Sequence, residues 1–260
     1  SLIEKSTLDL PKNYTAEEIA QIAGKSVFMI EIFDVYNSII ASGSGFFIDS
    51  NGTFVTNYHV IENAYSAEIV MTTGKRIAVD LLLGYDDNLD IAILKVKGDG
   101  YTALPLADSS KVINGNKIFC VGSPKGMQNS ISEGIVANSQ RQFGGNVYIQ
   151  ITAPISSGSS GGAVFNSEGK VIGISCGTIR DSQNLNLAIP SNFISLVSWN
   201  SPITLQDHYA QKTPAPRNTP QPTKKPAASN EYYPNTIIHS YTYITGVPIK
   251  SIYNADKTVI

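Results

Sequence analysis

The sequence predicts an all-β protein, folded as a barrel or a sandwich. Short apolar or alternating runs recur through residues 25–198, at intervals of about 8 to 12 residues that are typical of antiparallel sheets. Turn sequences such as Asn51-Gly52 separate these runs. Charged residues make up only 15% of the chain, against about 25% in average soluble domains. This low charge favours β structure and a location outside the cytoplasm.

Ten runs are expected to be strands, and one segment is expected to be a helix. The strands are 27–33, 45–48, 53–56, 68–71, 91–96, 117–121, 147–151, 163–165, 170–176 and 185–189. Thr15 and Glu18 have the spacing of a capping box, which predicts a helix over 16–23 that ends at Gly24. We expect this helix to pack on a barrel end, with a role as an oligomerisation arm as the alternative.

The chain divides into five parts. They are an N-terminal segment (1–24), a first barrel (25–108), a second barrel (109–198), a proline-rich linker (199–230) and a tyrosine-rich extension (231–260). Prolines cluster over 211–226, which predicts an extended and semi-rigid spacer. The last thirty residues are too few to bury a core alone. We interpret them as an added strand or hairpin, or as part of a longer module.

Composition argues against several functional classes. The net charge of −2 provides no basic surface that would bind nucleic acid. The sequence contains no run of 18 or more apolar residues, so it predicts no membrane span. The two cysteines, Cys120 and Cys176, are too few for a disulfide framework or a four-ligand zinc site. We expect free thiols, with a single bridge as the alternative, and neither metal nor cofactor. Whether a signal or anchor preceded Ser1 stays open.

Three segments carry catalytic chemistry when taken together. They contain His59, Asp90 and Ser160 in that order along the chain, which is the order of chymotrypsin-like proteases. A serine hydroxyl needs a base to become nucleophilic, and the base needs a partner that holds its tautomer. His59 would therefore take the proton of Ser160, and Asp90 would orient His59. Gly158 and Ser160 would supply backbone N–H groups to an oxyanion hole.

Two observations support this assignment of roles. The other histidines, His208 and His239, lie at the edge of or beyond the proline cluster (211–226), so His59 is the expected base. Residues 158–162 also fit the G-x-S-x-G elbow of α/β-hydrolases, but that elbow requires a following helix and a later histidine. Here a strand, a turn and a strand are expected to follow, which disfavours the elbow.

The segment from Ser42 to Phe193 resembles the HtrA/DegP family of trypsin-like serine proteases. The matching motifs lie at 43–48, 56–60, 89–94, 121–124, 132–136, 158–162, 171–174 and 188–191. The resemblance implies two perpendicular six-stranded antiparallel β-barrels, with His59 and Asp90 from the first and Ser160 from the second. It also implies a polypeptide substrate, a homotrimer and an extracytoplasmic location, secreted, periplasmic or at the cell surface. The family usually has Asn where this chain has Ser159, and its PDZ domain is missing here.

The resemblance also places the substrate. Ile155, Leu185 and Leu187 would line the primary pocket, and Ser175, Cys176 and Gly177 would pair with substrate backbone. Ser175 is also expected to donate to Asp90. We therefore predict a serine endopeptidase that cleaves unfolded or extended chains after small or medium aliphatic residues. Three alternatives stay open. In the first, Ile155 belongs to the core and does not line the pocket. In the second, the fold is a binding or chaperone module with a latent site. In the third, the enzyme is a glutamyl-specific endopeptidase that uses hydroxyls near Ser156.

Overall fold

A computed structural model of the chain describes residues 13–123, 130–156, 158–178, 186–199, 201–213, 242–244 and 247–249. The chain separates into two compact units, Ser1–Ala215 and Pro216–Ile260. In the second unit the described residues form two short antiparallel strands, β13 (Thr242–Ile244) and β14 (Val247–Ile249). The rest of the tyrosine-rich extension and the linker from residue 214 onward lie outside the described residues.

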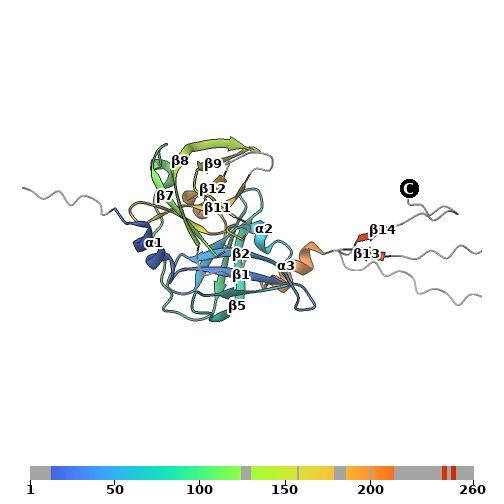
Figure 1. Cartoon of the computed structure of the whole chain (residues 1–260). Coiled ribbons are helices and arrows are strands. Elements are labelled where there is room, and N and C mark those ends of the chain that lie inside the picture. The colour runs from blue at the N-terminus through green and yellow to red at the C-terminus, as the bar shows by residue number, and fades with distance from the viewer. Residues whose placement is uncertain are drawn as a thin grey trace, which may run out of the picture. The chain divides into compact units, whose positions relative to one another are not determined.

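The first unit consists of two closed six-stranded antiparallel barrels (Figure 1). The first barrel has the order β1-β2-β3-β6-β5-β4 and the second has the order β10-β11-β12-β9-β8-β7. The strands of the first are β1 (Val27–Phe33), β2 (Ile39–Phe47), β3 (Thr53–Thr56), β4 (Ser66–Val70), β5 (Arg76–Asp86) and β6 (Ile91–Val96). Those of the second are β7 (Lys117–Gly122), β8 (Ser130–Phe143), β9 (Asn146–Ile151), β10 (Ala163–Asn166), β11 (Val171–Thr178) and β12 (Asn186–Pro190). The predicted all-β fold with two six-stranded barrels is confirmed.

One kind of apolar cluster fills the inside of a barrel, and another lies between the two barrels. Phe28, Phe47 and Phe54 form an aromatic centre inside the first barrel, with ring centroids 4.8 and 5.2 Å from Phe28. A separate cluster contains Phe46 of β2 together with Phe119 of β7, so it joins strands of both barrels. Because interiors pack densely and transmit displacement, this shared cluster fixes one barrel against the other along their junction.

Helix α1 (Ala16–Ala23) has the predicted bounds and the complete capping box between Thr15 and Glu18. Its apolar side chains Ile19 and Ala23 are fully buried in the cluster that joins the barrels. The N–H of Tyr14 also donates to the carbonyl of Ser167 at 2.7 Å. The expected packing of this helix on a barrel is confirmed.

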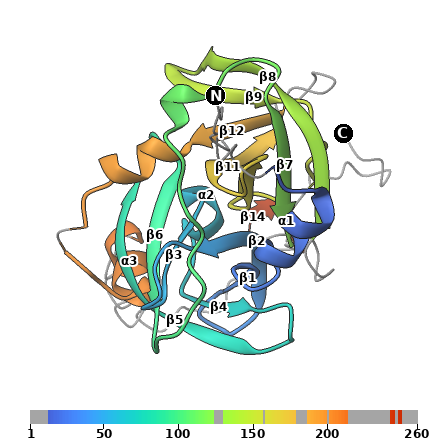
Figure 2. The ribbon, with the colours of Figure 1, turned by 90° about the vertical axis from the view of Figure 1, so that its left-hand side faces the viewer.

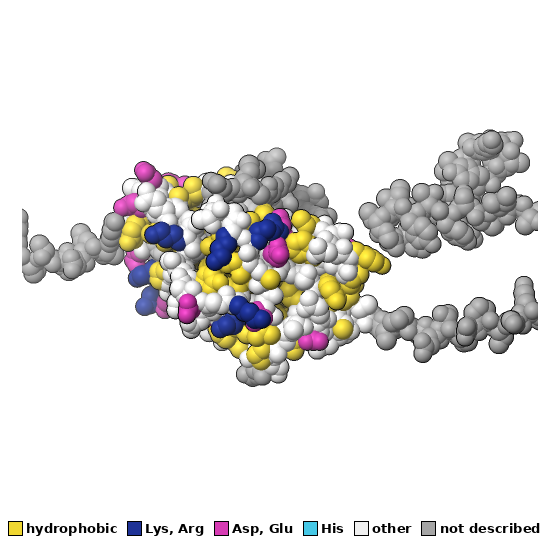
Figure 3. All heavy atoms as spheres, turned by 90° about the horizontal axis from the view of Figure 1, so that it is seen from below, with side chains coloured by type: hydrophobic (Ala, Val, Ile, Leu, Met, Phe, Trp, Pro, Cys, Tyr) yellow, Lys and Arg dark blue, Asp and Glu magenta, His cyan; other side chains and the backbone are white. Residues whose placement is uncertain are grey.

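Four further helical segments of the described residues connect or follow the barrels. They are α2 (Tyr58–Ile61), the 3-10 turns η1 (Ser109–Lys111) and η3 (Ser191–Leu196), and α3 (Leu205–Lys212). No helix in the described part of the chain is both long and apolar enough to cross a membrane. On the face shown in Figure 3, Lys and Arg side chains lie among Asp and Glu side chains rather than in one continuous field.

Two expectations about the fold need correction. The range 199–230 is not all linker, because Thr204 caps α3, which buries Leu205 and His208. The prolines that indicated a linker begin only at residue 214. Strands β5 and β8 were not predicted, and their side chains are mostly exposed or half-buried. Such strands lack the apolar run or strict alternation that marks a strand in sequence.

Loss of the N-terminal cap should destabilise the first unit. We expect Thr15→Ala to lower the free energy of unfolding by about 1 kcal/mol, because the N–H of Glu18 loses its acceptor. Urea unfolding followed by tryptophan fluorescence measures this change. Thr102→Ala, at an exposed position, is the control and should stay within about 0.5 kcal/mol of the wild type. Equal stabilities for the two variants would contradict a stabilising role for the cap.

Candidate active site

His59 lies on a single helical turn at the junction of the two barrels. The turn, α2, follows β3, and Figures 1 and 2 both show it between the barrels. The Nδ1 atom of His59 lies 2.8 Å from Oδ2 of Asp90. The backbone N–H of His59 donates to Oδ1 of the same carboxylate, also at 2.8 Å. The structure therefore brings the predicted base and its orienting acid into direct contact through two bonds.

Asp90 is held in an unusual backbone conformation at the start of β6. Its φ is +56°, in the left-handed region that costs a non-glycine residue about 1 to 2 kcal/mol. Its carbonyl accepts from the N–H of Tyr58 at 3.2 Å and from Nδ2 of Asn57 at 3.0 Å. Both the carboxylate and the carbonyl of Asp90 thus bind the segment that carries His59, and these contacts maintain the strained backbone.

The hydrogen bond to Asp90 raises the pKa of His59 above its ordinary value. Partial burial of the ring opposes this shift, and the negative charges of Asp90 and Glu62 add to it. The side chain of His59 stays 47% exposed, so a substrate or a serine hydroxyl can approach the ring. A raised pKa makes the neutral imidazole of His59 a stronger base than an ordinary histidine.

Ser160 lies in a tight turn between β9 and β10, named here the serine turn (158–162). Gly158 and Gly161 have φ values of +93° and +87°, which only glycine adopts readily. The N–H of Gly162 donates to the carbonyl of Ser159 at 2.9 Å and closes the turn. The N–H groups of Gly158 and Ser160 donate to no described residue. They are the two groups predicted to form the oxyanion hole.

The serine turn meets α2 across strand β2. The N–H of Ser44 donates to the carbonyl of Ser160 at 2.7 Å. A Cβ atom placed on Gly43 would lie 2.8 Å from the side chain of Val60 and 3.1 Å from the same carbonyl. The backbone of Ser160 and the helical turn of His59 are therefore neighbours. Among the described residues, no hydrogen bond joins the Ser160 hydroxyl to His59.

Ser175 has a different partner from the one expected. Its hydroxyl donates to the carbonyl of Ser159, and at 3.3 Å to that of Gly162, rather than to Asp90. The reason is the position of β11. Ser175 also exchanges backbone hydrogen bonds with Gly161 and Gly162, so its hydroxyl faces the carbonyls of the serine turn. The expected contact between Ser175 and Asp90 is wrong.

Cys176 and Gly177 follow Ser175 on β11. The Sγ of Cys176 lies 3.4 Å from the carbonyl oxygen of Leu187, and Gly177 pairs with Leu187. Burial raises the pKa of the Cys176 thiol to about 12, with a contribution from Asp90, so this thiol is no nucleophile at neutral pH. Burial likewise raises the pKa of Cys120 to about 12. Both thiols are free, as expected. Leu185 lies outside the described residues.

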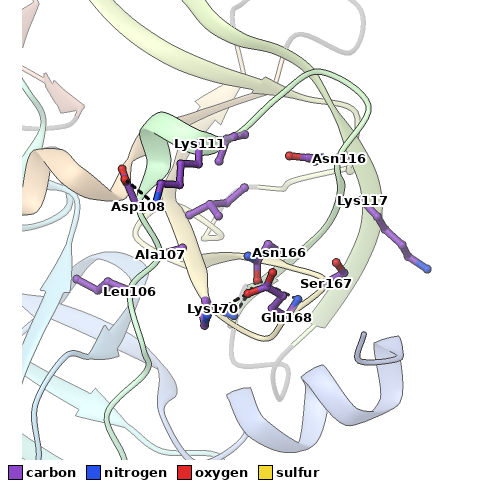
Figure 4. Close-up of a pocket in the computed structure, with 12 residues that line it drawn as sticks. Leu106, Ala107, Asp108, Lys111, Asn116, Lys117, Asn166, Ser167, Glu168 and Lys170 are labelled. Atoms are coloured by element: carbon purple, nitrogen blue, oxygen red, sulfur yellow. Dashed lines mark hydrogen bonds and ion pairs between the residues drawn. The ribbon is translucent and has the colours of Figure 1, made fainter. Parts of the chain in front are cut away.

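Ile155 lines a cavity of about 180 Å³ beside the serine turn. Its other walls include Ile131, Pro154, Ser156 and Ser159, so apolar side chains and hydroxyls share the lining. A cavity of about 470 Å³ lies elsewhere on the second barrel and contains none of the predicted site residues (Figure 4). Its Lys170 pairs with Glu168 at 3.0 Å, which reduces its attraction for an external anion.

Two residues next to the site were not predicted from the sequence. Ser44 binds the serine turn, and His208 of α3 packs against Tyr58, with ring centroids 5.9 Å apart. The sequence Thr204-x-x-Asp207 is a helix-cap signal that could have revealed α3. Ser44 lies within a matched motif, but no sequence signal indicates which atoms its hydroxyl binds.

Comparisons with known proteins agree with this architecture. Residues 43–174 match the family described as trypsin-like peptidase domain, and the chain belongs to this family. It is 36% identical over 154 residues to a probable periplasmic serine endoprotease, DegP-like, of Halomonas elongata, covering 57% of this chain and 32% of that protein. It is 35% identical over 198 residues to the serine protease HTRA1B of Danio rerio, covering 70% and 40%.

The anti-sigma-I factor RsgI9 of Acetivibrio thermocellus is 32% identical over 176 residues, which cover 67% of this chain and 24% of that protein. The chain thus spans between about a quarter and two fifths of the length of these relatives. Among solved structures, an HtrA-type protease with a tripeptide superposes with a TM-score of 0.64 and 25% identity, covering 70% of this chain and 62% of that one. The predicted similarity to the HtrA and DegP proteases is confirmed.

The pKa values of His59 and His208 should shift in opposite directions from the ordinary value for histidine. In NMR titrations we expect the pKa of His59 above 6.5, because Asp90 stabilises its charged form, and that of His208 below 6.5, because burial opposes its charge. His59 therefore adds stability at low pH that is lost as the pH rises through its raised pKa. Asp90→Asn should lower the pKa of His59 and leave that of His208 in place, which makes His208 the internal control. An unchanged His59 titration in Asp90→Asn would contradict the pairing.

Proposed function

We propose that this protein is a serine endopeptidase that uses His59, Asp90 and Ser160. The observation that carries the proposal is the doubly hydrogen-bonded contact between His59 and Asp90 beside the turn that presents Ser160. With Nδ1 of His59 bonded to the carboxylate, Nε2 is the nitrogen left to accept a proton. The comparisons support the same reaction class through relatives named serine proteases.

In the proposed reaction, Oγ of Ser160 attacks the scissile carbonyl carbon and its proton passes to Nε2 of His59. The carbonyl π electrons move to the oxygen, which accepts hydrogen bonds from the N–H groups of Gly158 and Ser160. When the tetrahedral intermediate collapses, the C–N bond breaks and His59 gives its proton to the leaving amine. Water then hydrolyses the acyl-enzyme by the same steps.

The proposed substrate is an extended polypeptide that binds along β11. This strand pairs with β10 only as far as Ile174, opposite Ala163. Cys176 and Gly177 continue beyond that point, so a substrate strand can add to the edge through main-chain hydrogen bonds. The backbone groups of Ser175 are already bonded to Gly161 and Gly162, so Ser175 would hold β11 against the serine turn instead of pairing with substrate as expected. An unfolded or flexible chain meets this requirement, because a folded protein has few free backbone segments.

The primary pocket is proposed to accept small or medium aliphatic side chains. Ile155 and Leu187 are apolar, and Leu187 is 5% exposed. An acidic side chain would need a cation to balance its charge in such a site. The hydroxyls of Ser156 and Ser159 nevertheless line the cavity beside Ile155, and this observation is the support for a glutamyl-specific alternative.

A binding or chaperone module with a latent site is the second candidate function. It is supported by the lack of a hydrogen bond between the Ser160 hydroxyl and His59 among the described residues. Long contacts of this kind also occur in unbound enzymes and tighten with substrate, so catalysis remains our preferred proposal. The relatives named periplasmic support an extracytoplasmic location. The homotrimer stays a prediction.

A fluorophosphonate probe should label the protein at Ser160. We expect Ser160→Ala to abolish labelling and casein cleavage, because the proposed reaction begins with attack by the Ser160 hydroxyl. Ser38→Ala, at an exposed turn, is the matched control and should label like the wild type. Mass spectrometry locates the probe. Labelling that persists in Ser160→Ala would refute the assignment, and peptide binding by an unlabelled wild-type protein would favour the latent module.

Peptide libraries varied at the residue before the scissile bond test the specificity. We expect kcat/KM for Val, Ala, Ile or Leu to exceed that for Lys, Arg or Glu by at least about tenfold, the scale of a few methylene contacts and an unbalanced charge. Ile155→Ser should reduce the ratio of kcat/KM for aliphatic residues to that for charged residues, because it removes apolar contact from the cavity wall. A preference for Glu in the wild type would instead establish the glutamyl-specific alternative.

A further inference from the structure

The side chain of Ser44 on β2 is fully buried and contacts the serine turn. Its Oγ lies 2.7 Å from the carbonyl oxygen of Gly158 and 2.8 Å from the backbone nitrogen of Ser123. A carbonyl can only accept and an N–H can only donate, so the single hydroxyl proton must point at Gly158. The bonding pattern of Ser44 is therefore determined by its neighbours.

The backbone of Ser44 binds the same region. Its N–H donates to the carbonyl of Ser160 at 2.7 Å, and its carbonyl accepts from the hydroxyl of Thr56 at 2.7 Å. One residue thus holds both ends of the peptide segment 158–160, together with the end of β3 that leads into the turn of His59. No other residue in the described ranges donates hydrogen bonds to the carbonyls of both Gly158 and Ser160.

We propose that the Ser44 hydroxyl is a positioning residue that holds the oxyanion hole in its working conformation. This inference rests on the proposed function and adds a residue to it. Gly158 has a φ of +93° and no side chain, so little in its own covalent structure resists rotation of its peptide groups. The bond from Ser44 to its carbonyl supplies that resistance. It orients the peptide between Gly158 and Ser159, and so the direction of the neighbouring N–H groups.

The contact with Ser123 extends the proposal to a second element. Ser123 follows β7, and the Cβ position of Gly122 lies 3.1 Å from the Ser44 hydroxyl. A movement of the end of β7 therefore changes the geometry of the bond to Gly158. The Ser44 hydroxyl thus links the end of β7 to the serine turn through two consecutive hydrogen bonds.

The test compares Ser44→Ala with Ser26→Ala. Both serines are fully buried, but the Ser26 hydroxyl has no hydrogen-bond partner and lies outside the proposed site. We expect Ser44→Ala to lower kcat on a peptide substrate by about tenfold or more, approaching the roughly 10²–10³-fold loss for removal of an oxyanion donor. KM should change little. Affinity for a peptide boronate, which forms a tetrahedral adduct, should fall by the same factor as kcat/KM. Ser26→Ala should match the wild type.

Hydrogen exchange gives a readout that does not depend on activity. The N–H of Gly161 donates to the carbonyl of Ser175 on β11, and the N–H of Gly162 donates to that of Ser159. We expect both N–H groups to exchange faster in Ser44→Ala than in Ser26→Ala. A wild-type protein without fluorophosphonate labelling would refute the proposed function, while the exchange comparison would still judge Ser44. Where Ser44→Ala fails to fold, Ser44→Cys keeps a weak donor and should show an intermediate kcat. Wild-type kcat in either folded variant, or equal loss of substrate and boronate affinity, would overturn the proposal.

Discussion

The close approach of strand β2 to the serine turn is the constraint on which the candidate site depends. A Cβ atom on Gly161 would lie 2.1 Å from the carbonyl oxygen of Ser44 and 2.3 Å from the hydroxyl of Thr56. Both distances are far inside van der Waals contact, and Gly161 also has a positive φ. Only glycine satisfies both conditions. The two barrels can therefore meet at hydrogen-bonding distance at the point where the proposed catalytic groups are divided between them.

The two halves of the site are held by different forces. His59 and Asp90 are joined within the first barrel by two hydrogen bonds to the Asp90 carboxylate, and hydrogen bonds between charged groups are stronger than neutral ones. Ser160 is held by backbone geometry, and its hydroxyl has no comparable bond to His59. The pair of His59 and Asp90 is thus preorganised by electrostatics. The position of Ser160, the proposed nucleophile, depends instead on the packing of one barrel against the other.

Local signals explain what the sequence could predict and what it could not. Thr15 and Glu18 determine the bounds of α1 because a capping box acts within one helical turn. The glycines of the serine turn were readable because their conformations exclude side chains. Strand β5 was missed because its half-buried residues depend on neighbours distant in sequence. The partner of Ser175 and the contacts of Ser44 were unpredictable for the same reason, since each hydrogen bond is decided by the register between strands.

Helix α3 shows how a segment assigned to a linker supports the first half of the site. Tyr58, the residue before His59, stacks on Tyr85 with ring centroids 4.6 Å apart, and Tyr85 precedes the turn that leads to Asp90. His208 packs edge-on against both rings and is 1% exposed. Lys212 donates to the Tyr58 hydroxyl at 2.8 Å and to Glu62 at 3.0 Å. These contacts hold the segments that lead to His59 and to Asp90. The last helix of the first unit, and not only the barrel strands, therefore stabilises the His59–Asp90 pair.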